Sequence, residues 1–190
     1  MKSCILLLAL TCLYSCTHPH YPNPHVVIET NYGDIEVELY PDKAPITANA
    51  FLSYIDSGYY ANSFFYRVVK ADDQPTSFNT GIIQGGVWQS NKINVPGLPH
   101  ESTARSGLSH TDGIISLART TPGSASTEFF ICIGDQSPLD SGRRGSPDGL
   151  GFAAFGKVWK GMDVVRKIQD QSSNGEYFIK KINIADIRRL

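Results

Sequence analysis

The stretch Phe64–Val69 has the sequence FFYRVV, in which a single arginine, Arg67, stands inside a run of aromatic and β-branched residues. Such a run is typical of a strand that is buried on both faces or that closes a barrel. An arginine is costly to desolvate there unless it has partners or a task. Two interpretations of Arg67 are therefore open. It is either a structural side chain at the barrel end, which extends to water or pairs with a carboxylate, or a functional group.

Other short strands are predicted on both sides of this stretch. Residues 26–28 and 35–39 flank the turn Asn31-Tyr32-Gly33, and residues 34–39 alternate acidic with apolar side chains, which predicts a β-hairpin. Further strands are predicted over residues 63–69, 82–85, 113–118, 128–133, 152–158 and 178–187. Many short strands without a βαβ rhythm favour a closed antiparallel barrel.

Two helices complete the expected fold. Pro45 suits the first position of a helix that runs to about Asp56, and Gly58 suits its end. A second helix is expected from Gly161. The predicted class is mainly β: a closed eight-stranded antiparallel β-barrel capped by two α-helices. Segment 134–150 is too long for a simple connector, which is typical of a functional or a disordered loop.

The bulk composition fits one globular domain with a short appendage. The chain has 190 residues, of which 41% are hydrophobic and 18% are charged, and its formal net charge is −1. No basic run in the sequence is longer than a pair such as Arg143-Arg144, so nothing predicts the basic face that nucleic-acid binding requires. We expect no nucleic-acid partner and a monomeric protein.

The first residues resemble an export signal. A short basic start precedes the almost wholly apolar stretch Ile5–Leu13, which is too short to span a bilayer. The next residues, Leu13–Cys16, look like the cleavage box of bacterial lipoproteins, in which Cys16 becomes the lipid-modified N-terminus. An ordinary secretory signal with a chance cysteine is the alternative interpretation.

The expected organisation follows from this signal. Residues 1–15 are predicted as the signal peptide, 16–25 as a lipid-anchored tether and 26–190 as the folded domain. The protein is then expected in the cell envelope or periplasm, with membrane contact only through the N-terminal lipid. Cys132 is the one cysteine in the sequence of the folded domain, so no disulfide can form within that domain.

The motifs of common catalytic and metal sites are missing from the sequence. It contains no P-loop, no GxSxG and no HExxH, and neither His100 nor His110 has an obvious serine or cysteine partner. These observations argue against a hydrolase. The histidines at positions 18, 20 and 25 lack further ligands at metal-binding spacing, so neither a metal nor a cofactor is expected.

Several segments, in this order along the chain, resemble the core of the cyclophilins. They are Phe65–Val69, Ile82–Gly86, Gly113–Arg119, Ser126–Ile131 and Gly151–Val158 with Gly161–Val165. Each is a weak motif alone, but together and in order they are specific, and the resemblance as a whole covers essentially Val26 to the C-terminus. The resemblance implies an eight-stranded barrel capped by two helices, and peptidyl-prolyl cis–trans isomerisation of proline-containing polypeptides.

The resemblance also implies roles for single residues. Arg67 matches the family's catalytic arginine, and Gln84 matches the glutamine that binds the substrate backbone and orients that arginine. Phe130 matches the aromatic floor of the proline pocket. Ile82, Ala118 and Leu139 match pocket walls, and Arg119, Glu128 and Phe152 stand at further substrate-binding positions.

The reaction explains why no nucleophile is needed. Resonance gives rotation about an X-Pro bond a barrier of about 20 kcal/mol. In the twisted transition state the prolyl nitrogen regains its lone pair, so a donor aimed at it stabilises the transition state more than the ground state. A guanidinium in an apolar groove suits this role because it stays protonated and its field is weakly screened.

The sequence departs from the family pattern at several places. Glu128 stands where many members have glutamine, and it could pair with Arg67 and hold it. An insertion over about residues 70–80 lengthens the connection before Gln84. Its Phe78 is a candidate for the aromatic residue that is missing at Gly81.

Three functions are compatible with these features. The favoured function is an isomerase that accelerates X-Pro rotation during the folding of exported proteins. The alternatives are a cyclophilin-fold module that binds proline-containing segments with little or no turnover, and a structural lipoprotein of the envelope. Isomerase assays and peptide-binding measurements would separate the three.

Overall fold

The computed structural model describes residues 21–70, 81–88 and 93–190. Cys16, Phe78 and the predicted signal peptide lie outside the described residues, as do half of the tether and most of the expected insertion. The predictions made for those segments therefore remain predictions.

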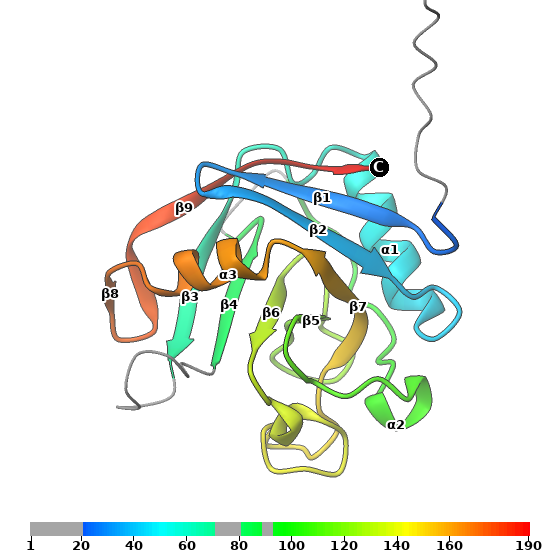
Figure 1. Ribbon diagram of the computed structural model, residues 1–190. Helices are drawn as coiled ribbons and strands as arrows, with labels where there is room; N and C mark the ends of the chain where they lie inside the picture. Colours follow the sequence, from blue (N-terminus) through cyan, green and yellow to red (C-terminus); the bar gives the residue numbers. More distant parts are fainter. Residues whose placement is uncertain (1–20, 71–80, 89–92) are drawn as a thin grey trace, which may run out of the picture.

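The described chain is built mainly of short strands (Figure 1). The strands are β1 (His25–Thr30), β2 (Gly33–Leu39), β3 (Ser63–Lys70), β4 (Gly81–Gly86), β5 (Ile114–Leu117), β6 (Phe129–Ile133), β7 (Ala153–Lys160), β8 (Ser173–Asn174) and β9 (Tyr177–Arg189). The helices are α1 (Pro45–Asp56), α2 (Thr103–Ser106), α3 (Met162–Gln169) and the 3-10 turn η1 (Ser137–Leu139).

The strands form one antiparallel sheet that closes on itself. In the order β1-β2-β7-β5-β6-β4-β3-β9 each strand pairs with the next, and β9 pairs back with β1. The two-residue strand β8 pairs with β9 beside this ring. The predicted closed eight-stranded barrel is confirmed. Closure pairs the strand edges that would otherwise be open to other chains.

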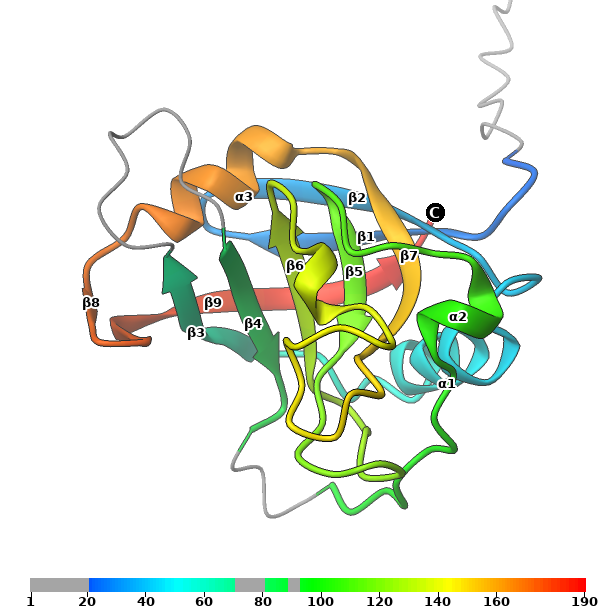
Figure 2. The same cartoon turned by 90° about the horizontal axis from the view of Figure 1, so that it is seen from below.

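Helices α1 and α3 pack on different sides of the barrel, as Figures 1 and 2 show. Helix α1 contacts β7 and β9, whereas α3 contacts β2, β4 and β6. Both correspond to the two predicted helices. The four-residue helix α2 was not predicted, because a single helical turn is too short to leave a periodic pattern in the sequence.

A buried glutamate fixes the start of α1. The side chain of Glu101 is only 1% exposed, and its carboxylate accepts the backbone N–H groups of Ile46 (3.1 Å) and Thr47 (2.7 Å). The first N–H groups of a helix have no partner within the helix, and the helix dipole favours a negative charge there. Glu101 therefore ties the segment before α2 to the beginning of α1.

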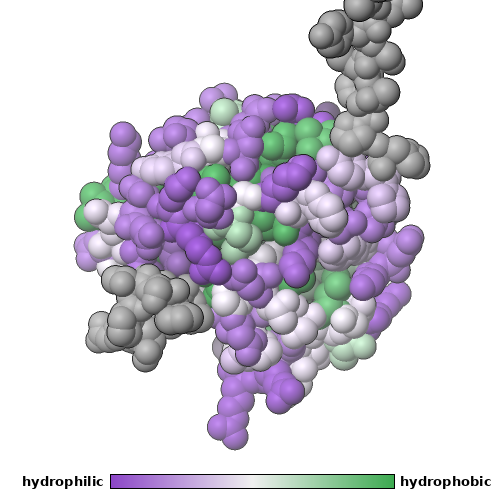
Figure 3. All heavy atoms as spheres, viewed as in Figure 1, coloured by the Kyte–Doolittle hydropathy of each residue, from purple (hydrophilic) through white to green (hydrophobic). Residues whose placement is uncertain are grey.

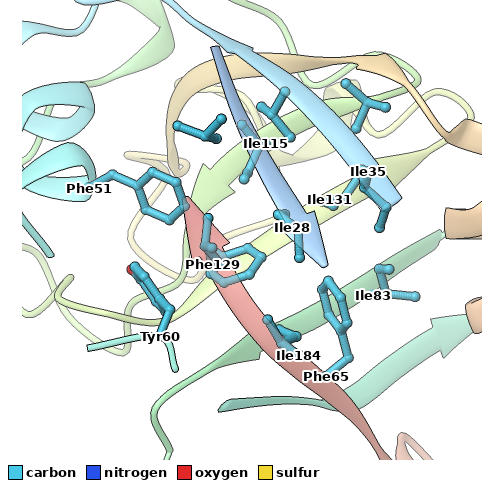
Figure 4. Close-up of a cluster of buried hydrophobic side chains, with 14 of the residues drawn as sticks. Ile28, Ile35, Phe51, Tyr60, Phe65, Ile83, Ile115, Phe129, Ile131 and Ile184 are labelled. Carbon is cyan, nitrogen blue, oxygen red and sulfur yellow. The ribbon is translucent and has the colours of Figure 1, made fainter. Parts of the chain in front are cut away.

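The barrel interior is filled by aliphatic and aromatic side chains (Figure 4). The ring of Phe129 lies edge-on to the rings of Phe51 and Phe65, with centroids 5.6 Å and 5.7 Å apart. Tyr60 is fully buried, and its hydroxyl donates to the carbonyl oxygen of Thr127 (3.0 Å). These edge-to-face contacts are favourable arrangements for aromatic rings.

A second apolar cluster lies on the other face of the same sheet. It includes Ile82, Phe130 and Cys132, whereas Phe129 and Ile131 belong to the interior core. The alternation along β6 therefore presents every second residue to the outside, as the period of two predicts. This outer cluster becomes the floor of the groove described below.

Strand β3 carries a β-bulge at Tyr66. Phe65 faces Gly85 and Arg67 faces Gln84 in the β3–β4 pairing, so Tyr66 is an extra residue without its own partner on β4. Phe65 and Val68 consequently both point into the core, and Tyr66 and Arg67 both line the outer groove. A regular strand would have placed Tyr66 and Arg67 on opposite faces.

The two ends of the folded domain meet. Val26 pairs with Arg189 across β1 and β9, and the N–H of Leu190 donates to the carbonyl oxygen of His25 (3.0 Å).

The face seen in Figure 3 is mainly hydrophilic, with apolar residues in small patches. Within the described ranges, no helix has the length and apolar character needed to cross a membrane.

Candidate active site

A groove of about 640 Å³ lies over the outer side of β3, β4 and β6. Its lining includes every residue that the sequence predicts for the site: Arg67, Ile82, Gln84, Ala118, Arg119, Glu128, Phe130, Leu139 and Phe152. The closed barrel thus brings residues from distant parts of the chain to one surface. Cys16, the predicted lipid site, lies outside the described residues.

One half of the groove is apolar. Phe130 forms its floor and is 2% exposed, and Phe152 stands edge-on to it, with ring centroids 5.4 Å apart. Ile82, Ala118 and Leu139 pack in the same cluster. An aromatic floor with aliphatic walls can hold a small apolar ring away from water.

A polar triad, of which two members are buried, supports this floor. The ring of His110 stacks on Phe130 at a centroid distance of 5.9 Å. Its Nδ1 lies 2.6 Å from a carboxylate oxygen of Asp140, and its Nε2 lies 3.1 Å from the hydroxyl of Ser116. Burial lowers the pKa of His110, although Asp140 acts in the opposite direction.

The sequence prediction that His110 has no serine partner was wrong, because Ser116 joins it from β5. The arrangement has the order of a hydrolytic triad, but Ser116 and His110 are both 0% exposed. A substrate carbonyl cannot reach a serine that is closed off in this way. The triad is therefore a support for Phe130 and not a hydrolytic site.

Arg67 is held between two partners. Its Nη1 donates to Oε1 of Gln84 (2.8 Å), while its Nε and Nη2 donate to Oε2 of Glu176 (2.9 Å and 2.6 Å). Glu176 lies in the turn between β8 and β9. The predicted pairing of Glu128 with Arg67 is not the arrangement in the structure, since Glu176 takes that place and Glu128 binds elsewhere.

A chain of hydrogen bonds leads from Arg67 to Glu128. Gln84 Nε2 donates to the hydroxyl of Tyr66 (2.7 Å), and that hydroxyl donates to Oε2 of Glu128 (2.6 Å). An ionised carboxylate only accepts, and a guanidinium only donates. The hydroxyl of Tyr66 must therefore donate its hydrogen bond to Glu128 and accept one from the Gln84 N–H. The oxygen of the Gln84 amide is then the end that faces Arg67. The two charged ends fix the orientation of the amide between them.

Glu128 sits in a pocket of donors. Besides Tyr66, it accepts from the hydroxyl of Thr127 (3.3 Å) and the N–H of Val87. A Cβ on Gly86 would come within 2.7 Å of both carboxylate oxygens, so glycine leaves the room that this side chain occupies. Burial raises the pKa of Glu128, and the hydrogen bonds oppose that shift. Burial and the nearby Glu128 also raise the pKa of Tyr66.

Arg119 lines the groove, but its charged end is already occupied. The guanidinium forms a two-pronged contact with Asp148 (2.7 Å and 2.8 Å) and donates to the carbonyl oxygen of Gly151. It also lies over the ring of Phe152, 5.3 Å from its centroid. Hydrogen bonding to Arg119 lowers the pKa of Asp148. Arg119 thus fastens the long 134–150 loop to the groove wall.

Sequence reasoning missed several residues of the groove. Tyr66 is adjacent to the predicted arginine, but in a regular strand it would lie on the opposite face. For Trp88 and Tyr177 the sequence offers only their aromatic type as an indication of a role in the site. For Glu176 it offers no indication, because the contact with Arg67 depends on how β8, β9 and β3 meet.

The comparisons with known proteins point to one family. The family model described as cyclophilin type peptidyl-prolyl cis-trans isomerase/CLD matches residues 25–189. A peptidyl-prolyl cis-trans isomerase of Acinetobacter baylyi is 40% identical over 148 residues, which cover 77% of this chain and 72% of the relative. Peptidyl-prolyl cis-trans isomerase A of Dickeya dadantii is 35% identical over 177 residues, which cover 92% and 86%.

A solved structure has the same fold. It is the cyclophilin type peptidyl-prolyl cis-trans isomerase of Cryptosporidium parvum, crystallised in the presence of the dipeptide Ala-Pro. It superposes with a TM-score of 0.68 at 27% identity and covers 86% of this chain and 97% of its own. Family model, relatives, fold and groove agree, and the chain belongs to the cyclophilin-type peptidyl-prolyl cis–trans isomerases.

Proposed function

We propose that the protein accelerates X-Pro rotation during the folding of exported proteins, and that Arg67 provides the stabilisation of the transition state. One observation carries the role of Arg67: its guanidinium is held by Gln84 and Glu176 at the polar side of a groove whose other half is apolar. A proline ring on Phe130 would bring the prolyl nitrogen to the side of the groove that Arg67 lines. The Ala-Pro dipeptide associated with the Cryptosporidium relative supports a proline-containing ligand.

The proposed chemistry needs no covalent step. As the amide twists, the prolyl nitrogen becomes pyramidal and gains a lone pair that an N–H of Arg67 can bind. The bonds to Gln84 and Glu176 leave further N–H groups of the guanidinium free to donate. Glu176 is 54% exposed, and an exposed ion pair of this kind contributes about 0–1 kcal/mol, so substrate can rearrange it at low cost.

Replacing Arg67 tests this mechanism. We expect Arg67→Ala to lower kcat/KM for a proline tetrapeptide by at least about tenfold, since it removes a contact made in the transition state. Arg67→Lys should fall between, because lysine keeps the charge but loses the planar fork. The matched control is Arg166→Ala, which removes an exposed, ion-paired arginine outside the groove. Equal rates for Arg67→Ala and wild type would refute the role, and peptide binding without rate enhancement in the wild type would favour a binding module.

We also propose export and a lipid anchor on Cys16. The basic start, the apolar stretch and the small Ser15 before Cys16 support this proposal. A mass spectrum of the mature protein should show an N-terminus at Cys16 that carries lipid, and Cys16→Ser should release the protein from the membrane fraction. An unmodified N-terminus at a nearby cleavage point would instead support an ordinary secretory signal.

A further inference from the structure

The groove continues past Arg67 onto two exposed aromatic rings. Trp88 and Tyr177 both line it, and they are 42% and 51% exposed. Trp88 stacks on Tyr66 at a centroid distance of 4.7 Å and on Tyr177 at 6.1 Å. We call Trp88 and Tyr177 the aromatic ledge. The isomerisation step proposed above does not use these two rings.

Neighbouring residues hold the aromatic ledge in place. Tyr66, on which Trp88 stacks, is itself fixed by its bonds to Glu128 and Gln84. Tyr177 faces Arg67 in the β3–β9 pairing and Asn174 in the β8–β9 pairing. Rings that are already ordered lose little conformational entropy when a ligand covers them, which is what a preorganised binding surface requires.

The position of the ledge suits a side chain of the substrate polypeptide that lies close to its proline. Arg67 and Tyr177 are cross-strand neighbours, and Tyr66 contacts Trp88 through its ring and Gln84 through its hydroxyl. An extended chain advances by roughly 3.3 Å per residue. A peptide that runs out of the apolar half past Arg67 would therefore reach the ledge within a few residues of the proline.

The chemistry of the ledge favours an apolar side chain. The carboxylate of Glu176 is engaged by Arg67, and the ammonium of Lys181 lies over Trp88, 5.1 Å from its centroid. The charges beside the ledge therefore already have partners, and what the ledge offers is aromatic surface. Such surface gains most by covering a large aliphatic or aromatic group.

We propose that the aromatic ledge is a second subsite, which binds a large apolar or aromatic side chain of the client polypeptide near the X-Pro bond. The proposal builds on the role of Arg67 set out above, because that role fixes where the proline lies. It makes the protein selective for prolines in apolar segments, which unfolded chains expose. A minimal peptide with alanine beside proline would leave the ledge empty.

The test uses peptides that differ only at the positions flanking proline. Each flanking position is occupied in turn by Phe, Ala, Lys or Glu, and kcat/KM is measured for every peptide. We expect the best Phe peptide to exceed its Ala counterpart by about 3–10-fold in the wild type, through KM. This ratio is insensitive to any general loss of activity, because both rates come from the same protein.

Matched tryptophan variants locate the effect. The chain has two tryptophans, and Trp159 is 56% exposed but does not line the groove. The Phe/Ala ratio should fall to about one in Trp88→Ala and drop in Tyr177→Ala, whereas Trp159→Phe should keep the wild-type ratio. In Trp159→Phe, Trp88 is the remaining tryptophan, so its fluorescence should change on titration with the Phe peptide and change little with the Ala peptide.

Several results would overturn the subsite. They are a Phe/Ala ratio of one in the wild type, a preference for Lys or Glu peptides, or an unchanged ratio in Trp88→Ala. A shift of the sedimentation coefficient in Trp88→Ala with an unchanged ratio would show instead that the ledge binds a second copy of the chain. The role of Arg67 is judged separately: an Arg67→Ala variant in the Trp159→Phe background should still report Phe-peptide binding at Trp88 even though turnover is lost.

Discussion

Tyr66 connects the two charged ends of the site. Its hydroxyl accepts from Gln84 and donates to Glu128. Because the carboxylate can only accept, it fixes which end of the Gln84 amide faces Tyr66. An amide side chain can otherwise rotate by half a turn and exchange its donor and acceptor ends. In that reversed state Gln84 would present N–H groups to the guanidinium and repel it. Tyr66 is thus a positioning residue for Arg67.

Removing this hydroxyl should affect both activity and stability. We expect Tyr66→Phe to lower kcat/KM about threefold or more, because Gln84 loses its orientation. It should also lower the free energy of unfolding by about 1–3 kcal/mol, because partly buried Glu128 loses a donor. Tyr40→Phe is a close control, since Tyr40 also donates to a glutamate (Glu38, 3.0 Å) but does not line the groove. Comparable loss of activity in both variants would contradict a positioning role.

Glu128 should make stability depend on pH in a recognisable direction. Burial raises its pKa in the folded protein above the ordinary value of 4.5. Its favourable contribution is therefore fully present below that value and is lost as the pH rises through the raised folded pKa. Glu128→Gln removes this titration. Relative to wild type, the variant should gain stability as the pH is raised from about 4 to 7, measured by urea unfolding at each pH. A difference that is constant with pH would contradict this expectation.

The same residue shows what a sequence can and cannot predict about the site. The members that match family motifs, from Arg67 to Phe152, all came together in the groove. The contact between Gln84 and Arg67 is confirmed. The carboxylate suggested for Arg67 was wrong: Glu128, which stands where many family members have glutamine, binds Tyr66 instead. Nearest neighbours in a site depend on ångström-scale placement of side chains, and Glu176 approaches Arg67 only through the turn between β8 and β9.

Among the elements, β3 shows the limit of reading strands by alternation. Its residues Phe65 to Val68 contain a bulge, and the inserted Tyr66 turns two successive side chains toward the groove. The bulge appears in the pairing with both β4 and β9, so tertiary partners determine it. Bulges are common beside active sites because they re-aim a side chain without breaking the sheet.

The contact of Glu101, in the segment before α2, with the start of α1 offers a test at the level of elements. We expect Glu101→Ala to lower the free energy of unfolding by about 1–3 kcal/mol, since two N–H groups at the start of α1 lose their acceptor. Glu29→Ala removes a glutamate from a surface ion pair with Arg188 and should cost about 0–1 kcal/mol. Chemical denaturation measures both, and equal effects would show that the buried cap contributes no more than a surface pair.

For the whole molecule, closure of the barrel depends on the last strand. Deleting residues 188–190 removes the pairing of Arg189 with Val26 and the bond from Leu190 to His25. We expect a loss of about 2–4 kcal/mol in the free energy of unfolding, at about 1 kcal/mol for each backbone hydrogen bond. The double variant Arg188→Ala/Arg189→Ala keeps the backbone and is the control. An equal loss in the control would attribute the effect to side chains and not to closure.

The fold as a whole was largely predictable. Each of the eight barrel strands has its own local pattern in the sequence, and the order of the cyclophilin-like segments indicated how these strands join. Extensions such as β7 to Lys160 and β9 to Arg189 went beyond the predicted limits, because pairing with neighbours lengthens a strand past its apolar residues. Short elements such as α2 and β8 owe their form to their surroundings and were missed.

The meeting of the two ends at His25 and Leu190 has a practical consequence. A short linker between these residues would join the ends of the domain with little strain, so circular permutants with new ends in a surface turn should keep the barrel. A fluorescent label or a fusion partner attached after Leu190 would emerge beside the tether. Since neither residue lines the groove, such an attachment would leave the substrate path open.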